Sequence, residues 1–425
     1  MKKVVIVGGG ASGLLVAINV ARLSKEPIAV TIAEPNLFLG KGIAYGTQNP
    51  DHLLNVPAGR MSALVEEPEH FCNWGGFDSN HFASRIEYGE YLLATFISAQ
   101  RENPKVTFEH HQDMVGSIAE VQGSYQVQFN QSDSRSFDVV VLALGQGRAI
   151  RHHVLEQFSG NPRVINDAWR DYIREFDGTL VCVGTGLTFI DHGLVHLRKN
   201  PNNRVIGISR NGLLPEPHLA KRAAALDVPA NAKLSPNSIR EFIENASDWR
   251  AAQDGVRHEL PDIWVSWNDE KKSDFLNTHL RWWNVHRHRI SNDIHQELNE
   301  ALDHGRITIV QDEVVAVRED QNSLTVITKS HGKFAASAAI NCLGYEASGP
   351  GTLVDSLLES KVLASGPLKM GISTNYPHHN VLNGHGEVSE NFFALGPILI
   401  GERFETTAIP EIRRQARDVA AAIVC

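Results

Sequence analysis

The N-terminal stretch 3–34 constrains the fold most, because it combines several features in a fixed order. An apolar run, Val4–Val7, predicts a buried strand, and a glycine-rich turn, 8–13, follows it directly. Residues 14–23 then read as a helix, and a second predicted strand, 29–33, ends at Glu34. This order is typical of a βαβ unit that holds a dinucleotide.

Each glycine of the turn has a physical role in such a unit. Gly8 makes the tight turn, Gly10 lets the backbone approach a pyrophosphate, and Gly13 lets the helix pack close to the strand. The turn is completed by Ala11 and Ser12, at a helix N-terminus whose free N–H groups favour phosphate. Glu34 can accept hydrogen bonds from ribose hydroxyls, a role that a purely structural glycine turn would leave unexplained.

A second, less complete copy lies in the middle of the chain. The predicted strand 179–183 leads into a turn and a helix that extends to about residue 199, and the strand 204–209 follows. The residues of this turn are Gly184, Thr185, Gly186, Leu187 and Thr188. Phe189 replaces the third glycine, so helix and strand must lie farther apart or pack differently. Arg210 follows the second strand in place of an acid, which suits the 2′-phosphate of NADP, although a solvated surface arginine gives the same pattern.

The strands that follow each turn form a repeat. Residues 105–147 and 306–344 each read as a meander of three strands and then a buried strand that ends in Leu-Gly. Ordinary hairpins would not give this order twice, so we predict an α/β fold with two Rossmann-like dinucleotide-binding domains and β-meander crossovers. The expected domains are 1–165, 166–335 and 336–425, in which the first and third parts form one domain.

Residues 215–300 interrupt the second domain as a predicted helical insertion, with helices at 237–246 and 273–301. The insertion holds five of the seven tryptophans, which are Trp249, Trp264, Trp267, Trp282 and Trp283. We expect them to form its own core, with a substrate-pocket roof as the alternative.

Composition excludes several classes of function. The net charge of −9 without a basic block argues against nucleic acid or an anionic membrane surface as a partner. The four cysteines are scattered, which fits a reducing cytoplasm, and no apolar stretch approaches the length of a membrane span. We expect no metal site, because neither the pair His192 and His196 nor the pair His286 and His288 has a recognised ligand pattern.

The C-terminal stretch 391–425 reads as a short strand, a loop that begins with Gly396-Pro397, and a helix that starts near Thr406 or Thr407. A threonine at this point is a plausible N-cap. The free N–H groups of such a helix could face a carbonyl of a cofactor ring.

Together these motifs resemble flavoproteins that bind FAD and NAD(P)H in two domains of the glutathione-reductase type. More narrowly, the chain resembles a bacterial FAD/NAD(P)-binding protein family that includes a flavin-dependent urate hydroxylase. The resemblance is carried by GKGIAYGTQNPDHLLNVPAGRMSAL (40–64), GTGLTFID (184–191), ISRNGLLPEPH (208–218), RWWNVHRHRI (281–290) and ALGPILIGERFETTAIPEIRRQA (394–416).

The resemblance implies that the turn 8–13 and Glu34 hold FAD, while the turn 184–188 and Arg210 hold NADPH or NADH. It implies that further FAD contacts come from Asn55, Gly145, Gly396, Pro397 and Thr407. Asn55 and Arg403 are the candidates for the substrate site, although Arg403 could instead pair with Glu402 or Glu405.

Two adjacent nucleotide sites predict a relay of electrons from NAD(P)H to FAD. Residues 35–71 contain no cysteine, which makes a disulfide reductase improbable. We therefore expect a monooxygenase that uses O2 and a flavin hydroperoxide to hydroxylate a small polar metabolite, without a catalytic protein nucleophile. The alternatives are a flavin oxidase or dehydrogenase with a vestigial second site, and a non-catalytic nucleotide-binding regulator.

Overall fold

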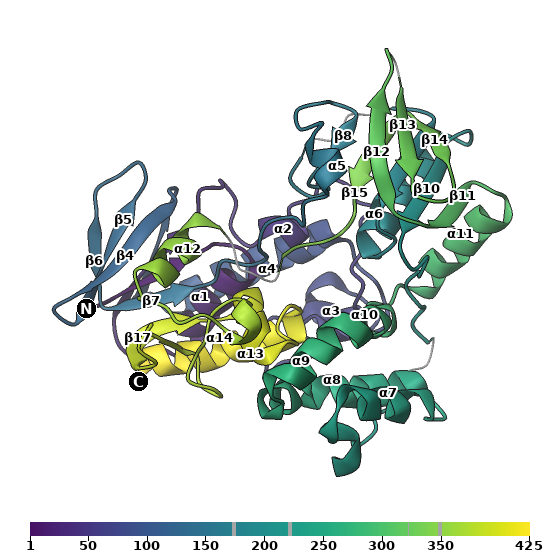
Figure 1. Cartoon of the computed structure of the whole chain (residues 1–425). Coiled ribbons are helices and arrows are strands. Elements are labelled where there is room, and N and C mark those ends of the chain that lie inside the picture. The colour runs from purple at the N-terminus through teal and green to yellow at the C-terminus, as the bar shows by residue number, and fades with distance from the viewer. Residues whose placement is uncertain (172–175, 220–222, 322, 347–350) are drawn as a thin grey trace.

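The computed structural model describes residues 1–171, 176–219, 223–321, 323–346 and 351–425. It consists of two modules built on parallel sheets, with a group of helices packed beside the first module (Figure 1). Both ends of the chain lie in the first module. Within the described ranges, no helix combines the length and the apolar character needed to cross a membrane.

The first module has a six-stranded sheet in the order β16-β17-β7-β1-β2-β3. Its strands are β1 (Lys2–Val7), β2 (Ile28–Ala33), β3 (Val106–His111), β7 (Val139–Leu142), β16 (Asn380–Leu382) and β17 (Val388–Ala394). β1 pairs in parallel with β2 and β7, so Val7 lies beside Ala33 and Leu142. The turn after β1 and the ends of β2 and β7 therefore meet at one edge of the sheet.

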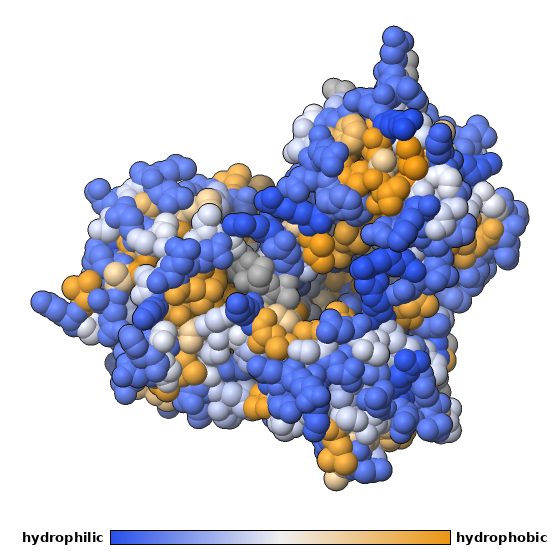
Figure 2. Space-filling model, in the orientation of Figure 1, coloured by the Kyte–Doolittle hydropathy of each residue, from blue (hydrophilic) through white to orange (hydrophobic). Residues whose placement is uncertain are grey.

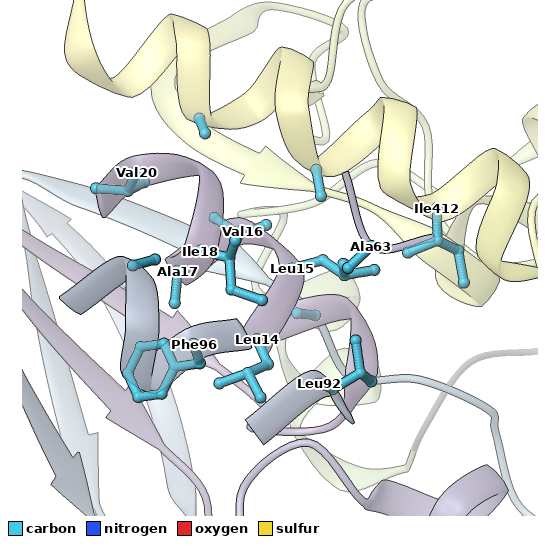
Figure 3. Packing of buried hydrophobic residues seen from close by; sticks show 14 of the residues in the cluster. Leu14, Leu15, Val16, Ala17, Ile18, Val20, Ala63, Leu92, Phe96 and Ile412 are labelled. Carbon is cyan, nitrogen blue, oxygen red and sulfur yellow. The ribbon is translucent and has the colours of Figure 1, made fainter. Parts of the chain in front are cut away.

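Three helices form the core above this sheet: α1 (Ala11–Leu23), α4 (Arg85–Glu102) and α14 (Ile409–Val424). α1 is buried from Ser12 to Ala21 and passes between the other two, as Figure 3 shows. α4 starts with a capping box in which the Ser84 hydroxyl accepts from the Glu87 N–H and the Glu87 carboxylate accepts from the Ser84 N–H. Its apolar stripe, which includes Tyr88, Tyr91, Leu92 and Phe96, faces the core.

The second module repeats the plan with a five-stranded sheet in the order β11-β10-β9-β15-β8. Its strands are β8 (Val164–Ile165), β9 (Thr179–Val183), β10 (Arg204–Ser209), β11 (Ile307–Gln311) and β15 (Ala338–Asn341). α6 (Leu187–Lys199) follows β9, as predicted. Because β8 and β15 both pair in this sheet, the chain crosses between modules slightly outside the expected boundaries at 165 and 335.

Each module also carries a three-stranded meander, which confirms the repeat but corrects its composition. The meanders are β4 (Val115–Val121), β5 (Ser124–Phe129) and β6 (Arg135–Phe137), and β12 (Val314–Glu319), β13 (Leu324–Thr328) and β14 (Lys333–Ala336). The first strand of each predicted meander instead joins the parallel sheet as β3 or β11. The third strands, β6 and β14, were not predicted, because they are short edge strands without a distinct apolar pattern.

The insertion forms α7 (Pro236–Glu244), α8 (Trp249–Ser266), α9 (Asp269–Asp274), a π-helical turn at Phe275–His279, and α10 (Leu280–Arg287). The predicted helix over 273–301 is wrong, because the chain leaves the helix at His288 and α11 (Asn292–Asp303) begins after an N-cap at Ser291. The remaining short helices are α2 (Gly42–Tyr45), α3 (His70–Gly75), α5 (His153–Glu156), α12 (Thr352–Glu359) and α13 (Ile400–Arg403).

The insertion packs against the first module, although the sequence places it within the second. Trp264 and Trp283 are fully buried, as expected for its core. The Trp264 ring stacks on Phe404 with centroids 4.7 Å apart, and its Nε1 donates to the Gly401 carbonyl at 2.8 Å. α8 therefore lies beside α13, and the insertion shares its core with the C-terminal segment (Figure 1).

Phe189 fits into the second module because a neighbouring strand leaves room for it. The ring is buried, and a Cβ added to Gly207 in β10 would lie 2.8 Å from the Phe189 Cε2 atom. A glycine on the strand thus compensates for the missing glycine on the helix.

We predict that Gly207→Ala destabilises the protein by about 1–3 kcal/mol, the cost of overpacking a core. The cost should shrink in a Phe189→Leu background, because the two sites share one space. Gly193→Ala is the control: its Cβ would make an ordinary 3.5 Å contact with Val205, and alanine favours the helix by about 0.5–1 kcal/mol. Urea unfolding of the four variants measures these differences, and equal effects of Gly207→Ala in both backgrounds would contradict the explanation.

Candidate functional site

A cavity of about 260 Å³ lies where the two modules and the insertion meet. The surface is hollowed between the lobe that carries β4–β6 and the lobe that carries β12–β14 (Figure 2). Residues from both predicted nucleotide sites line this cavity, namely Asn55 and Thr407 for the first and Leu187 and Thr188 for the second. Further lining residues, which sequence reasoning missed, are Arg60, Arg85, Asp191, His218, Asp254, Arg257, Arg287, His288 and Arg289.

The first glycine turn has the geometry of a phosphate cradle. Gly8 has a φ of +104°, and a Cβ there would lie 2.4 Å from the Ala143 carbonyl oxygen. A Cβ on Gly13 would lie 2.0 Å from the Gly8 carbonyl oxygen, so α1 can pack this close to the turn only with a glycine at position 13. At Gly10, by contrast, a Cβ would meet no protein atom closer than 3.6 Å. The turn is thus closed by protein at Gly8 and Gly13, whereas at Gly10 it meets only Gly42, across an ordinary contact. Gly10 is the position at which this motif brings a backbone close to a pyrophosphate.

Glu34 is buried at the end of β2, and its carboxylate faces the glycine turn. One oxygen accepts from the Gly9 N–H at 2.9 Å, and the other accepts from the Asn36 N–H at 3.0 Å and from the Asn36 side-chain amide at 2.5 Å. An ionised carboxylate offers about four acceptor positions. Glu34 therefore retains one position that can accept a hydrogen bond from a ribose.

The C-terminal segment reaches the same edge of the sheet. Gly396 has a φ of +80°, its N–H donates to Gln415 at 2.8 Å, and an added Cβ would lie 3.1 Å from the Ser12 hydroxyl. Pro397 follows in a short 3-10 turn. Gly145, with a φ of +71°, has no protein atom within 4 Å of an added Cβ. Gly396 therefore lies against the first turn, and Gly145 follows β7, the strand next to β1. Their contact with FAD stays a prediction.

The expected threonine N-cap is wrong. α14 begins at Ile409 with Ala408 as its N-cap, and Pro410 sets the start of the helix. Thr406 is fully buried and donates to the Gly396 carbonyl at 3.0 Å. Thr407 lines the cavity and accepts from Arg287 at 3.1 Å. Both side chains thus fix the loop before the helix.

The second turn has the same shape and is more open. Gly184 has a φ of +106° and lies against the Cys342 carbonyl, whereas no protein atom lies within 4 Å of a Cβ added to Gly186. Thr185 is buried and holds the loop by donating to the Leu213 carbonyl at 2.6 Å. Arg210 is exposed after β10 and forms no ion pair with the described residues.

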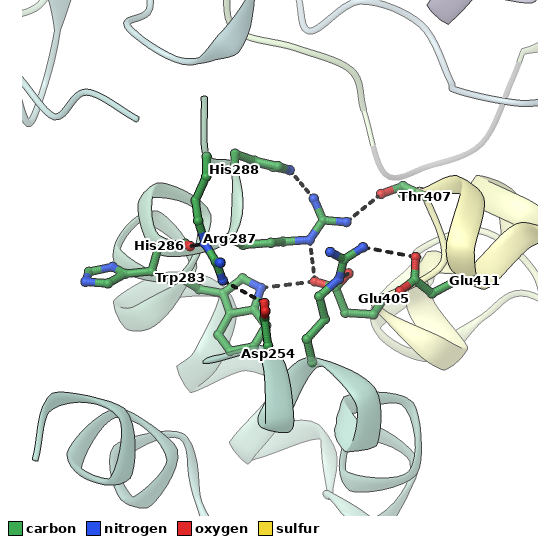
Figure 4. A network of polar contacts seen from close by, with 10 residues as sticks. Asp254, Trp283, His286, Arg287, His288, Glu405, Thr407 and Glu411 are labelled. Atoms are coloured by element: carbon green, nitrogen blue, oxygen red, sulfur yellow. Dashed lines mark hydrogen bonds and ion pairs between the residues drawn. The ribbon is translucent and has the colours of Figure 1, made fainter. Parts of the chain in front are cut away.

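A network of buried charges forms the wall of the cavity on the insertion side (Figure 4). The Glu405 carboxylate accepts from Arg287 Nε at 2.5 Å and from the Trp283 indole at 3.2 Å, and Arg257 lies 3.4 Å away. Arg257 also pairs with Glu411 at 3.0 Å. A second buried pair, Asp254 and Arg289, lies nearby at 2.7 Å.

Several other candidates take ordinary structural positions. Arg403 is buried outside the cavity, where it donates to the His378 carbonyl at 2.6 Å and lies 3.5 Å from Glu402. His286 contacts the rings of Trp249 and Trp282, while the neighbouring His288 contacts Arg287. His192 contacts Trp169, and His196 bonds to the Gly178 carbonyl at 2.9 Å. Of these candidates, only His288 lines the cavity, and the tryptophan that lines it is Trp169, outside the insertion.

Comparison with known proteins bears on the cofactor-binding class of the first part of the chain and on the fold of the whole. Residues 5–147 match the model of a protein family described as FAD-NAD(P)-binding. The predicted resemblance to FAD- and NAD(P)-binding proteins is thus confirmed for this part of the chain. No curated protein sequence matches the chain significantly.

Solved structures share the fold over the whole chain. The ornithine N-hydroxylase of Kutzneria sp. 744 has a TM-score of 0.63 at 13% identity, over 99% of this chain and 98% of that chain. The ornithine hydroxylase of Pseudomonas aeruginosa has a TM-score of 0.63 at 14% identity, over 100% of this chain and 98% of that chain. The bacillithiol disulfide reductase of Staphylococcus aureus has a TM-score of 0.56 at 12% identity, over 99% of this chain and 98% of that chain. The chain therefore has the predicted fold of flavoproteins with two dinucleotide-binding domains.

We predict that Glu405→Gln destabilises the protein by about 3–5 kcal/mol, because it leaves the buried Arg287 guanidinium without its anion and the buried Arg257 guanidinium with Glu411 alone. Glu66→Gln, which breaks an exposed pair with Arg417, should cost about 0–1 kcal/mol. Unfolding in urea at pH 7 measures both.

The effect of Glu405→Gln should also depend on pH. Burial raises the pKa of Glu405, but the charges of Arg287 and Arg257 outweigh it and lower the pKa from 4.5 to about 2. A depressed pKa stabilises the folded protein above pH 4.5, and this stabilisation is lost as the pH falls towards 2. The stability gap between wild type and Glu405→Gln should therefore narrow over that range, and a constant gap would contradict the assignment.

Proposed function

We propose that this protein is an FAD-dependent, NADPH-consuming oxidoreductase, and specifically a flavin monooxygenase that hydroxylates a small polar metabolite. The observation that carries the proposal is that residues of both glycine-turn modules line one cavity of about 260 Å³. A hydride can pass directly between two cofactors only if both reach one space. The bound cofactors supply hydride transfer and oxygen activation, and the protein supplies binding, orientation and a polar wall.

The solved structures with a similar fold are consistent with a monooxygenase but do not distinguish it from other flavoproteins, because hydroxylases and a disulfide reductase share this architecture. A disulfide reductase needs cysteines beside the flavin. Here Cys72, Cys182 and Cys342 are buried and Cys425 is exposed in the last position, and none of the four lines the cavity. This observation favours a reaction centred on the flavin itself.

Two other functions stay open as alternatives. The first is a flavin oxidase or dehydrogenase with a vestigial second site, which Phe189 suggested. The open space at Gly186 and the room that Gly207 makes for Phe189 speak against a degraded site. The second is a nucleotide-binding regulator without turnover.

The proposal is tested with purified protein. We expect a yellow protein with one FAD per chain, whose flavin is bleached by NADPH without oxygen and is reoxidised by O2. Small amines, amino acids and purines are then screened for faster NADPH oxidation with less peroxide released. Protein that takes up no FAD would refute the proposal, while bound FAD that neither NADPH nor NADH reduces would favour the oxidase.

We predict opposite effects for matched substitutions in the two turns. Gly10→Ala should fold, since its Cβ meets no protein atom closer than 3.6 Å, but should be isolated without FAD because the methyl group occupies the pyrophosphate position. Gly186→Ala should keep its FAD and lose affinity for NADP+. Visible spectra and NADP+ titrations distinguish the variants. A fully yellow Gly10→Ala protein would show that the first turn is misassigned.

We also predict that Arg210 selects NADPH over NADH. Burial lowers the pKa of Arg281 and the Arg210 charge lowers it further, so two guanidinium groups share this corner. Arg210→Ala should weaken NADP+ binding roughly 10- to 100-fold, as expected for a lost charge-assisted hydrogen bond, and leave NAD+ binding unchanged. Arg204→Ala, at the opposite end of β10, is the control. Unchanged NADP+ affinity in Arg210→Ala would refute the role.

A further inference from the structure

An ion pair joins the two modules beside the cavity. Arg85, the first residue of α4, donates to the Asp191 carboxylate of α6 at 3.0 Å, and the two side chains are only 13% and 14% exposed. The Arg85 guanidinium lies over the Trp169 ring at 4.8 Å and also donates to the Ala44 carbonyl at 3.3 Å. Arg85 and Asp191 both line the cavity. A charged pair with so little exposure has a defined geometry.

Three rings enclose this pair. His52, from the first module, contacts Trp169 and His192 of the second, with ring centroids 5.2 Å and 4.9 Å apart. Trp169 and His192 lie 4.9 Å from each other. Side chains of the two modules thus alternate in one cluster, which we call the module clamp and define as His52, Arg85, Trp169, Asp191 and His192.

The module clamp links α6, the helix of the second glycine turn, to α4, which packs against α1, the helix of the first glycine turn. α4 packs against α1, and the N-terminus of α1 belongs to the first glycine turn. Asp191 lies in α6, whose N-terminus belongs to the second turn. The Trp169 indole donates to the Thr188 hydroxyl at 3.3 Å, so the clamp extends to the second turn itself. A shift of α6 relative to α4 would have to break these contacts.

We propose that the module clamp sets the alignment of nicotinamide and flavin for hydride transfer, with Arg85 and Asp191 as positioning residues. The inference rests on the proposed function. Bound cofactors would supply this step: the C4–H bond of the nicotinamide would break, and the hydride would carry both electrons of that bond to the flavin. NADPH would thereby be oxidised to NADP+ while FAD would be reduced by two electrons.

The sensitivity of hydride transfer to distance gives the clamp its importance. The reacting atoms must lie about 3–3.5 Å apart, and a displacement of about 1 Å can cost roughly 100-fold in rate. Each cofactor would be bound by its own module, so the contacts between modules decide this distance. A buried ion pair adds little net stability because both charges lose their hydration, but it fixes the relative orientation of the two side chains and of the helices that carry them.

Stopped-flow reduction of the bound flavin by saturating NADPH, without oxygen, tests the proposal. Arg85→Met and Asp191→Leu should each lower the limiting rate constant roughly 10- to 100-fold. FAD content and the Kd for NADP+ should stay within about twofold of wild type. The double variant should lose little more than either single variant, because both remove the same contact. Arg85→Lys keeps the charge and should recover part of the rate.

Arg135→Met is the matched control, since its 2.8 Å ion pair with Glu109 lies within the first module. It should reduce its flavin at the wild-type rate. Unchanged rates in Arg85→Met and Asp191→Leu would overturn the proposal. Slower reduction with an equal loss of FAD or NADP+ binding would also overturn it, because the residues would then bind a cofactor instead of aligning the modules.

Hydrogen exchange gives a readout that does not depend on turnover. Peptides that cover the first turn of α6 and the loop around His52 should exchange faster in Arg85→Met than in Arg135→Met. If wild-type protein holds no FAD or is not reduced by NADPH, the proposed function fails. The clamp is then judged by exchange alone, and equal exchange in the two variants would refute it.

Discussion

The cavity depends on the buried carboxylate of Glu405. Arg287 and Arg257 come from the insertion, and together they neutralise a charge that could not otherwise leave water. Glu405 lies four residues before the start of α14, so its position fixes the loop that carries Thr407 into the cavity. One interaction thereby attaches the insertion to the first module and shapes the wall where a flavin ring would lie.

The same requirement explains why the cavity is polar. The hydrophobic cores of the two modules and of the insertion form distinct clusters, although the insertion's cluster includes Phe404 of the first module, and the cavity lies where the edges of these cores meet. Edges of cores offer charged and amide groups, which must find partners when other modules cover them. The pairs Arg85–Asp191 and Arg287–Glu405 satisfy this demand. Contacts that hold the modules together therefore also line the space between the presumed cofactors.

Sequence alone was sufficient where the determinants are local. The first βαβ unit, the second turn and the apolar stripe of α4 follow from periodicity and turn chemistry, which act over a few residues. The sequence alone was insufficient where interacting residues lie far apart along the chain. Arg287 and Glu405 are 118 residues apart, and the sequence around one of them does not indicate the other as its partner. Likewise, Phe189 suggested a looser second turn, because its compensating Gly207 lies on the next strand.

The two turns differ in a way that bears on how each nucleotide would be held. The first turn is covered by its own loop: the Gly40 N–H donates to the Gly9 carbonyl at 2.8 Å, and Gly42 lies against Gly10. In the described part of the chain, no atom lies within 4 Å of a Cβ added to Gly186, and Arg210 is exposed. A ligand on the first turn must displace ordered backbone to leave, whereas one on the second turn is free to exchange. This asymmetry is what a permanently bound FAD and a transient NADPH require of a single chain.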